Sequence, residues 1–304
     1  IWYTGDGGQT WQSRSPLPVL TGGDQLNPIN LYFIDASHGW YLGQIYPGMN
    51  QVYSVLYRTE DGGVTWQKVS DTLPTDQPRS GLPGSYSIPY GRQLYFFADA
   101  QHGVAGDNSL YVTQDGGANW VEQTLPEGPN FPQLEQPSSF VQPPVFVSPD
   151  QGLVLMGVYD YVNVACPPCD LFQGLPAALY LYQTADGGKT WTVQPAPARI
   201  GDAGYIDAST IWFLGRSDGA QMTTTLYRSG DLGASWSVVA QDTPLPLGTQ
   251  ISFVDALNGF ATNPAAGRMY ASLDLKNTSG GDPYFYQTSD GGQTWLAVEA
   301  RSIQ

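Results

Sequence analysis

The stretch Thr184-Ala185-Asp186-Gly187-Gly188-Lys189-Thr190-Trp191 decides the fold of this chain, because it is one of six copies of a single motif. The other copies run from Thr4 to Trp11, Thr59 to Trp66, Thr113 to Trp120, Ser229 to Trp236 and Thr288 to Trp295. All fit the pattern Ser/Thr-x-Asp-x-Gly-x-Thr/Ser/Asn-Trp. A motif that recurs in this way indicates an architecture built from repeats.

Each copy of the motif predicts a hairpin turn between two strands. Its Asp can accept hydrogen bonds from backbone N–H groups further on, its Gly suits a positive φ, and its Trp begins the next strand. Strand-like residues such as Leu179-Tyr180-Leu181-Tyr182 come before it. We therefore predict a structural role for Asp6, Asp61, Asp115, Asp186, Asp231 and Asp290, and for Trp11, Trp66, Trp120, Trp191, Trp236 and Trp295. One carboxylate per turn provides too few oxygens for calcium, and we predict no metal site.

A second repeat, typified by Phe33-Ile34-Asp35-Ala36-Ser37-His38-Gly39-Trp40, alternates with the first and also reads as strand, turn, strand. His38, and His102 in a related copy, fall in these turns, where we predict a turn or capping role. Together the two hairpins make a four-stranded antiparallel unit. The motif aspartates are 45 to 71 residues apart, which is typical of β-propeller blades with insertions.

We therefore predict an all-β fold with a single β-propeller domain over residues 1–304. Six blades are expected, the first of them incomplete, and seven are possible in a full-length protein. The predicted bounds are 1–14 for the partial blade and about 26–71, 86–125, 140–195, 203–240 and 250–299 for the others. Because the first blade has only two strands, we interpret the chain as a fragment of a longer protein.

The motifs resemble the Asp-box, or bacterial neuraminidase repeat, of β-propellers. The pairing of Phe-x-Asp-Ala-x-x-Gly-Trp with Thr-x-Asp-Gly-Gly-x-Thr-Trp is most similar to the photosystem II assembly factor family within the sialidase-like propellers. That resemblance implies a propeller that binds a membrane complex. The Asp-box also occurs in sialidases, xyloglucan-type glycoside hydrolases and sortilin-type receptors, so a carbohydrate-active role is the alternative.

The net charge and the two cysteines limit the kinds of partner and the cellular compartment. A formal charge of −15 disfavours nucleic acid and anionic lipid as partners. No apolar run is long enough to cross a membrane. Cys166 and Cys169 lack the helix-start context of a redox pair, so we favour a disulfide in an oxidising compartment, with free thiols and redox or metal chemistry as alternatives. An extracytoplasmic location follows.

Loops of variable length predict where a binding site lies. The loops after the second and fourth strands of each unit share one face and hold nearly all of the length variation, and function tends to lie on variable loops over a rigid scaffold. We predict binding residues among their arginines and aromatic side chains, namely Arg79, Tyr86, Tyr90, Arg92, Phe131, Tyr159, Tyr161 and Phe172. The alternative is that these aromatic rings pack the loops on themselves.

No catalytic constellation is visible, and we predict no catalytic residue and no cofactor. The arginine set and the Arg-Ile-Pro motif that a likeness to sialidases would imply are absent. A glycosidase needs two opposed carboxylates, and the sequence pairs none of Asp71, Asp76, Glu127, Glu135, Asp160, Asp170 and Asp282. We predict a non-catalytic scaffold that docks a protein partner or a membrane or cell-surface complex. The alternative is a carbohydrate-binding protein or glycoside hydrolase.

Overall fold

The computed structural model describes residues 2–14, 26–48, 51–72, 95–106, 109–160, 176–216, 223–246, 249–262 and 285–298. Within these ranges the regular structure consists of β-strands, with no helix, so none of them contains a helix that could cross a membrane. The chain forms two compact units, Ile1–Leu125 with Asp186–Lys189, and Pro126–Ala185 with Thr190–Gln304. We describe each unit by itself.

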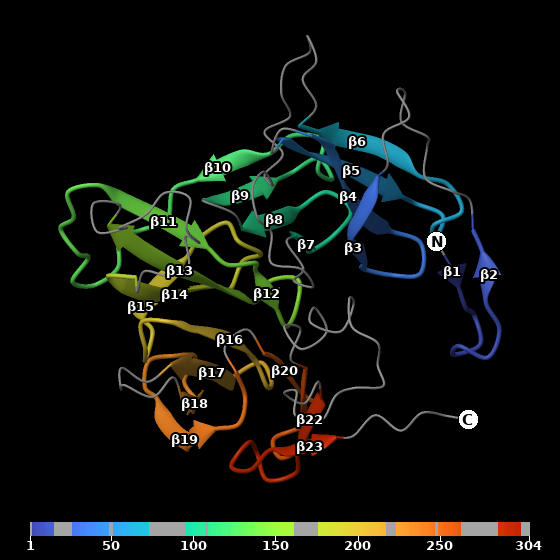
Figure 1. Cartoon of the computed structure of the whole chain (residues 1–304). Helices are drawn as coiled ribbons and strands as arrows, with labels where there is room; N and C mark the ends of the chain where they lie inside the picture. The colour runs from blue at the N-terminus through green and yellow to red at the C-terminus, as the bar shows by residue number, and fades with distance from the viewer. Residues whose placement is uncertain are drawn as a thin grey trace. The chain divides into compact units, whose positions relative to one another are not determined.

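The first unit contains a two-stranded hairpin and two four-stranded antiparallel sheets (Figure 1). The hairpin is β1 (Trp2–Tyr3) and β2 (Gln12–Ser13). Blade 1 is β3 (Asn27–Phe33), β4 (Gly39–Gly48), β5 (Gln51–Thr59) and β6 (Gln67–Asp71). Blade 2 is β7 (Tyr95–Phe97), β8 (Gly103–Gly106), β9 (Leu110–Thr113) and β10 (Val121–Gln123).

The second unit contains three further antiparallel sheets. Blade 3 is β11 (Pro137–Val141) with β12 (Val145–Phe146), then β13 (Gly152–Asp160), β14 (Ala178–Thr184) and β15 (Thr192–Pro195). Blade 4 is β16 (Gly201–Tyr205), β17 (Ile211–Arg216), β18 (Thr224–Ser229) and β19 (Ser237–Thr243). Blade 5 is β20 (Gln250–Phe253), β21 (Gly259–Thr262), β22 (Phe285–Thr288) and β23 (Leu296–Val298).

Over the described residues the fold is an all-β propeller with five blades of four antiparallel strands, consecutive in sequence. In blade 3 the first strand is split, because β11 and β12 both pair with β13. The predicted fold class is confirmed. The predicted count of six blades is not confirmed, because the motif at Thr4 to Trp11 lies in the β1–β2 hairpin, which has two strands.

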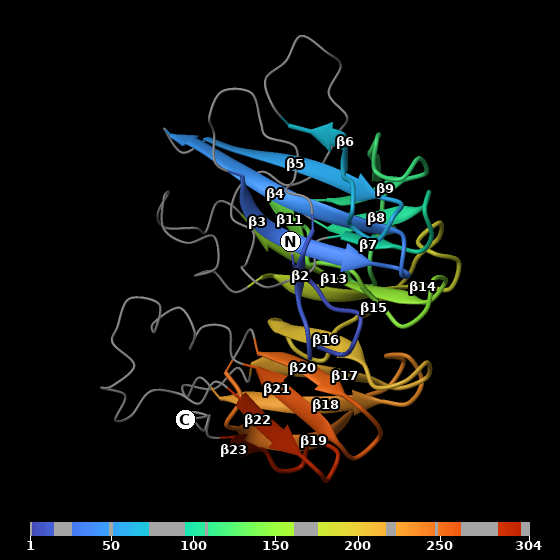
Figure 2. The same ribbon diagram turned by 90° about the vertical axis from the view of Figure 1, so that its right-hand side faces the viewer.

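Apolar side chains from neighbouring blades form the core. In the first unit, Trp40 of blade 1 stacks on Phe97 of blade 2 with ring centroids 3.7 Å apart, and Trp120 meets Phe97 edge-on at 5.9 Å. In the second unit, blades 4 and 5 lie side by side (Figure 2). Trp212 and Leu226 of blade 4 belong to the same hydrophobic cluster as Tyr286 and Trp295 of blade 5. Burial of apolar side chains between neighbouring blades therefore contributes to the hydrophobic stabilisation of each unit.

Blade 5 exposes the face that blade 4 buries. By strand register, Phe260 corresponds to Trp212 and Phe285 corresponds to Leu226. Trp212 and Leu226 are 5% and 1% exposed, whereas Phe260 and Phe285 are 53% and 42% exposed. Leu296 and Val298 add to this apolar face of blade 5.

Candidate functional site

The two kinds of repeated turn lie together at one end of each blade, which we call the turn face. In blade 1 the backbone N–H of Gly62 donates to the Ser37 carbonyl at 2.8 Å. The same hydrogen bond, at the same distance, recurs in two other blades. The N–H of Gly116 donates to the Gln101 carbonyl in blade 2, and the N–H of Gly291 donates to the Leu257 carbonyl in blade 5. The opposite strand ends form the variable face, which is where long connecting segments begin and end.

On the turn face, hydrogen bonds occupy the motif carboxylates. Asp61 accepts from the Thr59 hydroxyl at 2.8 Å, from the Val64 N–H at 2.9 Å and from the Thr65 hydroxyl at 2.6 Å. Asp6, Asp115, Asp231 and Asp290 accept equivalent bonds. The Thr65 hydroxyl contributes most to lowering the pKa of Asp61 to about 2. A carboxylate held in this way fixes the turn and is poorly suited to proton transfer.

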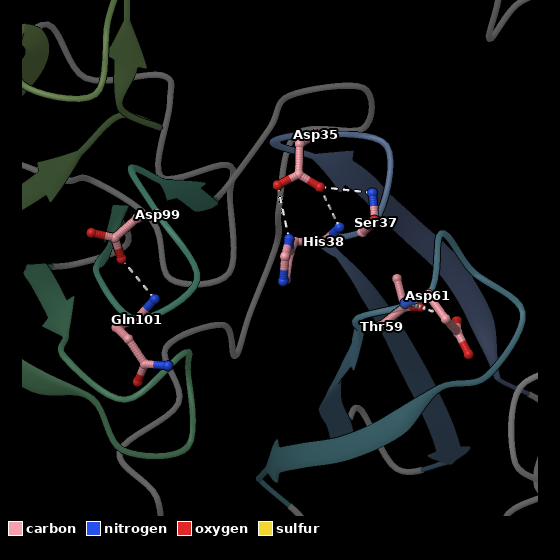
Figure 3. Close-up of polar contacts among 7 residues, drawn as sticks. All are labelled: Asp35, Ser37, His38, Thr59, Asp61, Asp99 and Gln101. Carbon is pink, nitrogen blue, oxygen red and sulfur yellow. Dashed lines mark hydrogen bonds and ion pairs between the residues drawn. The ribbon is translucent and has the colours of Figure 1, made fainter.

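His38 completes the turn of the second repeat in blade 1 (Figure 3), and His102 does the same in blade 2. Asp35 accepts the N–H groups of Ser37 and His38 at 2.7 Å, and its carboxylate lies 2.8 Å from His38 Nδ1. These bonds lower the pKa of Asp35 to about 2. Among the residues that the structure describes, no three His, Cys, Asp or Glu side chains gather into a metal site.

The turn carboxylates make acid stability a direct test of this geometry. Asp290 has a folded-state pKa lowered to about 2, chiefly by the Thr294 hydroxyl, so its stabilising effect is complete above the unfolded pKa of about 4. Unfolding free energy should therefore fall as the pH drops from about 4 towards 2. We expect Asp290→Asn to flatten this fall in urea titrations between pH 7 and 2.5. An identical pH dependence in variant and parent would contradict the assignment.

Two of the predicted binding residues, Phe131 and Tyr159, lie in the described part of the variable face. Phe131 belongs to the connection that precedes blade 3, and Tyr159 is near the end of β13. Arg79, Tyr86, Tyr90, Arg92, Tyr161 and Phe172, and the cysteines Cys166 and Cys169, lie outside the described residues.

The segment Pro126–Gln136, which we call the anchored segment, is fixed by two tyrosines of β14. The Tyr182 hydroxyl donates to the Pro126 carbonyl at 2.8 Å, and the Tyr180 hydroxyl donates to the Pro129 carbonyl at 3.2 Å. The Phe131 ring stacks on the Tyr180 ring with centroids 5.7 Å apart and planes 10° apart. Burial raises the pKa of both tyrosines, so their hydroxyls stay protonated donors.

The other end of the anchored segment reaches the end of β13. The backbone N–H of Gln136 donates to the Asp160 carboxylate at 3.4 Å. Tyr159 is half-buried, and burial raises the pKa of its hydroxyl. On the next connection, Arg199 Nε donates to the Pro176 carbonyl at 2.9 Å. The variable face of blade 3 thus brings together aromatic rings, a carboxylate and a guanidinium group.

Sequence reasoning missed Tyr180, Tyr182 and Arg199. The two tyrosines alternate with Leu179 and Leu181, a pattern that predicts only a strand with two packed faces. No local sequence pattern indicates that a loop, rather than a neighbouring sheet, covers the face of the strand that holds the two tyrosines. Arg199 lies in a short connection without any motif around it.

Comparison with known proteins finds similarity in structure. No protein-family model and no curated protein sequence matches the chain. The GH74 xyloglucanase from Xanthomonas campestris is 15% identical with a TM-score of 0.47, over 88% of this chain and 37% of that one. The Niastella koreensis GH74 enzyme is 14% identical with a TM-score of 0.44, over 84% of this chain and 36% of that one. The GH62 α-L-arabinofuranosidase catalytic domain of Coprinopsis cinerea is 12% identical with a TM-score of 0.37, over 91% of this chain and 96% of that one. The chain spans about a third of the GH74 proteins.

These findings correct the predicted function. The sequence analysis predicted a non-catalytic scaffold that docks a protein partner or a membrane complex. That prediction is wrong: the similar structures whose names state an activity are named as glycoside hydrolases, not as scaffolds or assembly factors. The error has a physical origin: Tyr and Arg on surface loops serve protein interfaces and sugar sites equally well, so their presence does not separate the two.

Proposed function

We propose that this protein is a carbohydrate-binding β-propeller whose ligand lies on the variable face of blade 3. The observation that carries the proposal is the anchored segment, which places Phe131, Asp160 and the neighbouring Tyr159 at one end of one blade. Aromatic rings offer an apolar surface for the C–H faces of a sugar ring. Carboxylate and guanidinium groups bind hydroxyls with directional, charge-assisted hydrogen bonds.

Hydrolysis of the bound glycan is the second candidate activity. The variable face supplies the carboxylates of Asp160, Glu127 and Glu135, and the latter two are exposed. A retaining glycosidase holds its two carboxyl groups about 5–5.5 Å apart, and an inverting one about 6.5–9.5 Å apart. If two of the three act as such a pair, the amide substitutions of those two, among Asp160→Asn, Glu127→Gln and Glu135→Gln, will abolish sugar release, a loss far larger than any loss of binding that accompanies it.

The experiment that tests binding is a titration of the purified chain with soluble polysaccharides. Xyloglucan and arabinan are the first probes, followed by calorimetry with oligosaccharides of the better one and by an assay for released reducing ends. We expect saturable binding that Phe131→Ala weakens by about ten-fold or more, because Phe131 is a half-buried ring that also holds the anchored segment on Tyr180. The matched control is Trp11→Ala, which removes an exposed aromatic ring from a turn of the first unit. Absence of binding to every glycan would overturn the proposal.

We further propose that the repeats are of the Asp-box kind, that residues 1–304 form a single propeller domain with a sixth blade, and that the protein works outside the cytoplasm. The exposed apolar face of blade 5 supports a further blade, because blade 4 buries the corresponding face against its neighbour. A sixth copy of the motif, in the β1–β2 hairpin, also supports this count. A crystal structure of the protein tests the count.

A further inference from the structure

We infer that the part of the anchored segment from Pro126 to Phe131 is a preformed binding loop for a neutral glycan, and that Tyr180 and Tyr182 are its positioning residues. This inference rests on the proposed function. It adds the loop, the residues that hold it and the class of glycan.

The first argument is the way in which the loop lies on the sheet. Gly128 is buried, whereas Glu127, Pro129 and Asn130 on either side of it are exposed. A Cβ at Gly128 would lie 2.2 Å from Cε1 of Tyr180, so the backbone rests directly on that ring. One side of the loop is therefore fixed to β14, and the other side presents Glu127 and Asn130 to solvent.

The second argument is that contacts within the protein hold the loop. Two tyrosine hydroxyls hold the carbonyls of Pro126 and Pro129, and the Phe131 ring stacks on Tyr180. Proline at 126, 129 and 132 restricts φ, and Asn130 takes a left-handed conformation with φ of 55°. A binding loop that is already ordered loses little conformational entropy when ligand binds, so such anchoring contributes directly to affinity.

The third argument concerns the charge of the ligand. Residues 126–136 contain Glu127 and Glu135 and no Lys or Arg, and the chain has a formal charge of −15. Glu127 lies close enough to Tyr182 to add to the effect of burial in raising its pKa. An anionic glycan would be repelled by these carboxylates, whereas a neutral one can donate hydroxyl hydrogen bonds to them.

The test compares the parent with the double variant Tyr180→Phe/Tyr182→Phe, which removes the two anchoring hydroxyls and keeps both rings. We expect neutral oligosaccharide binding to weaken about ten-fold, because ligand must then order the loop. Backbone amides of residues 127–131 should exchange faster in the free variant, and the oligosaccharide should protect them in the parent. The control, Tyr205→Phe/Tyr227→Phe, alters two tyrosines of blade 4 and should bind as the parent does. Parent binding to polygalacturonate should be at least about ten-fold weaker than to a neutral glycan.

The outcomes separate the two proposals. If the parent binds no glycan, the proposed function fails and this inference fails with it. If the parent binds but the double variant binds equally well, or the ligand protects amides elsewhere and not in the loop, only this inference is overturned. A merely structural role for the hydroxyls would lower the melting temperature and leave the affinity of the remaining folded protein unchanged. Equal binding of neutral and anionic glycans would overturn the ligand class.

Discussion

Trp120→Ala should destabilise the first unit by about 3–5 kcal/mol, the usual cost of truncating a buried tryptophan. Trp120 is 5% exposed and meets Phe97 edge-on, while Phe97 stacks on Trp40 of the neighbouring blade. Its Nε1 also donates to the Gly117 carbonyl at 3.0 Å, so the substitution leaves a cavity between two blades and removes one of the two hydrogen bonds that this carbonyl accepts, the other coming from the Ser70 hydroxyl. Urea unfolding followed by circular dichroism measures the loss.

Trp11→Ala is the matched control for this prediction. Trp11 occupies the same position of the same motif, and its Nε1 makes the same bond, to the Gly8 carbonyl at 3.0 Å. It is 56% exposed, however, so its removal creates little cavity and should cost less than about 1 kcal/mol. Equal effects of the two substitutions would show that the motif tryptophan acts through its hydrogen bond rather than through packing between blades.

Gly62→Ala should destabilise the same unit by about 2–4 kcal/mol, from a left-handed conformation and from overpacking. Gly62 has φ of +70°, and a Cβ there would lie 2.6 Å from the backbone oxygen of Ala36. That oxygen belongs to the adjoining turn and cannot rotate away. The two turns must separate, which breaks the 2.8 Å hydrogen bond from the Gly62 N–H to the Ser37 carbonyl.

Gly7→Ala separates the two contributions. Gly7 has φ of +71°, almost the value at Gly62, but a Cβ there would have no atom within 4 Å. Only the conformational cost of about 1–2 kcal/mol applies. The two variants are compared by urea unfolding and by amide exchange at Ser37, His38 and the substituted residue. A Gly62→Ala effect no larger than that of Gly7→Ala would contradict the close approach of the two turns.

Most of the fold could be predicted from the sequence, because the determinants of the turns are local. A Thr59 hydroxyl, an Asp61 carboxylate and a glycine with positive φ lie within a few residues of one another, so a short motif contains the whole turn. Two alternating turns then fix a four-stranded sheet. The number of blades is different, since it depends on whether flanking strands pair, and Thr4 to Trp11 has the complete motif in a hairpin of two strands.

The candidate site was predicted only in outline. Phe131 and Tyr159 stood out as aromatic residues on segments of variable length. The anchors Tyr180 and Tyr182 did not, because their partners are backbone carbonyls 51 and 56 residues away in the chain. Every residue has a backbone carbonyl, so the residue types at Pro126 and Pro129 do not indicate that their carbonyls accept these hydrogen bonds. The class of ligand could not be read from the sequence for a similar reason, as the same side chains suit proteins and sugars.

The bonds between blades have a consequence for how such a protein can evolve. Trp40 Nε1 and the Ser70 hydroxyl of blade 1 donate to the carbonyls of Gly116 and Gly117 in the next blade, at 2.9 and 2.7 Å. Because the acceptors are main-chain atoms of a turn that every blade contains, a blade that carries these two donors can meet the same acceptors on whichever copy follows it. A duplicate of such a blade would therefore bring these docking contacts with it, and its outward loops would be free to diverge in length and sequence.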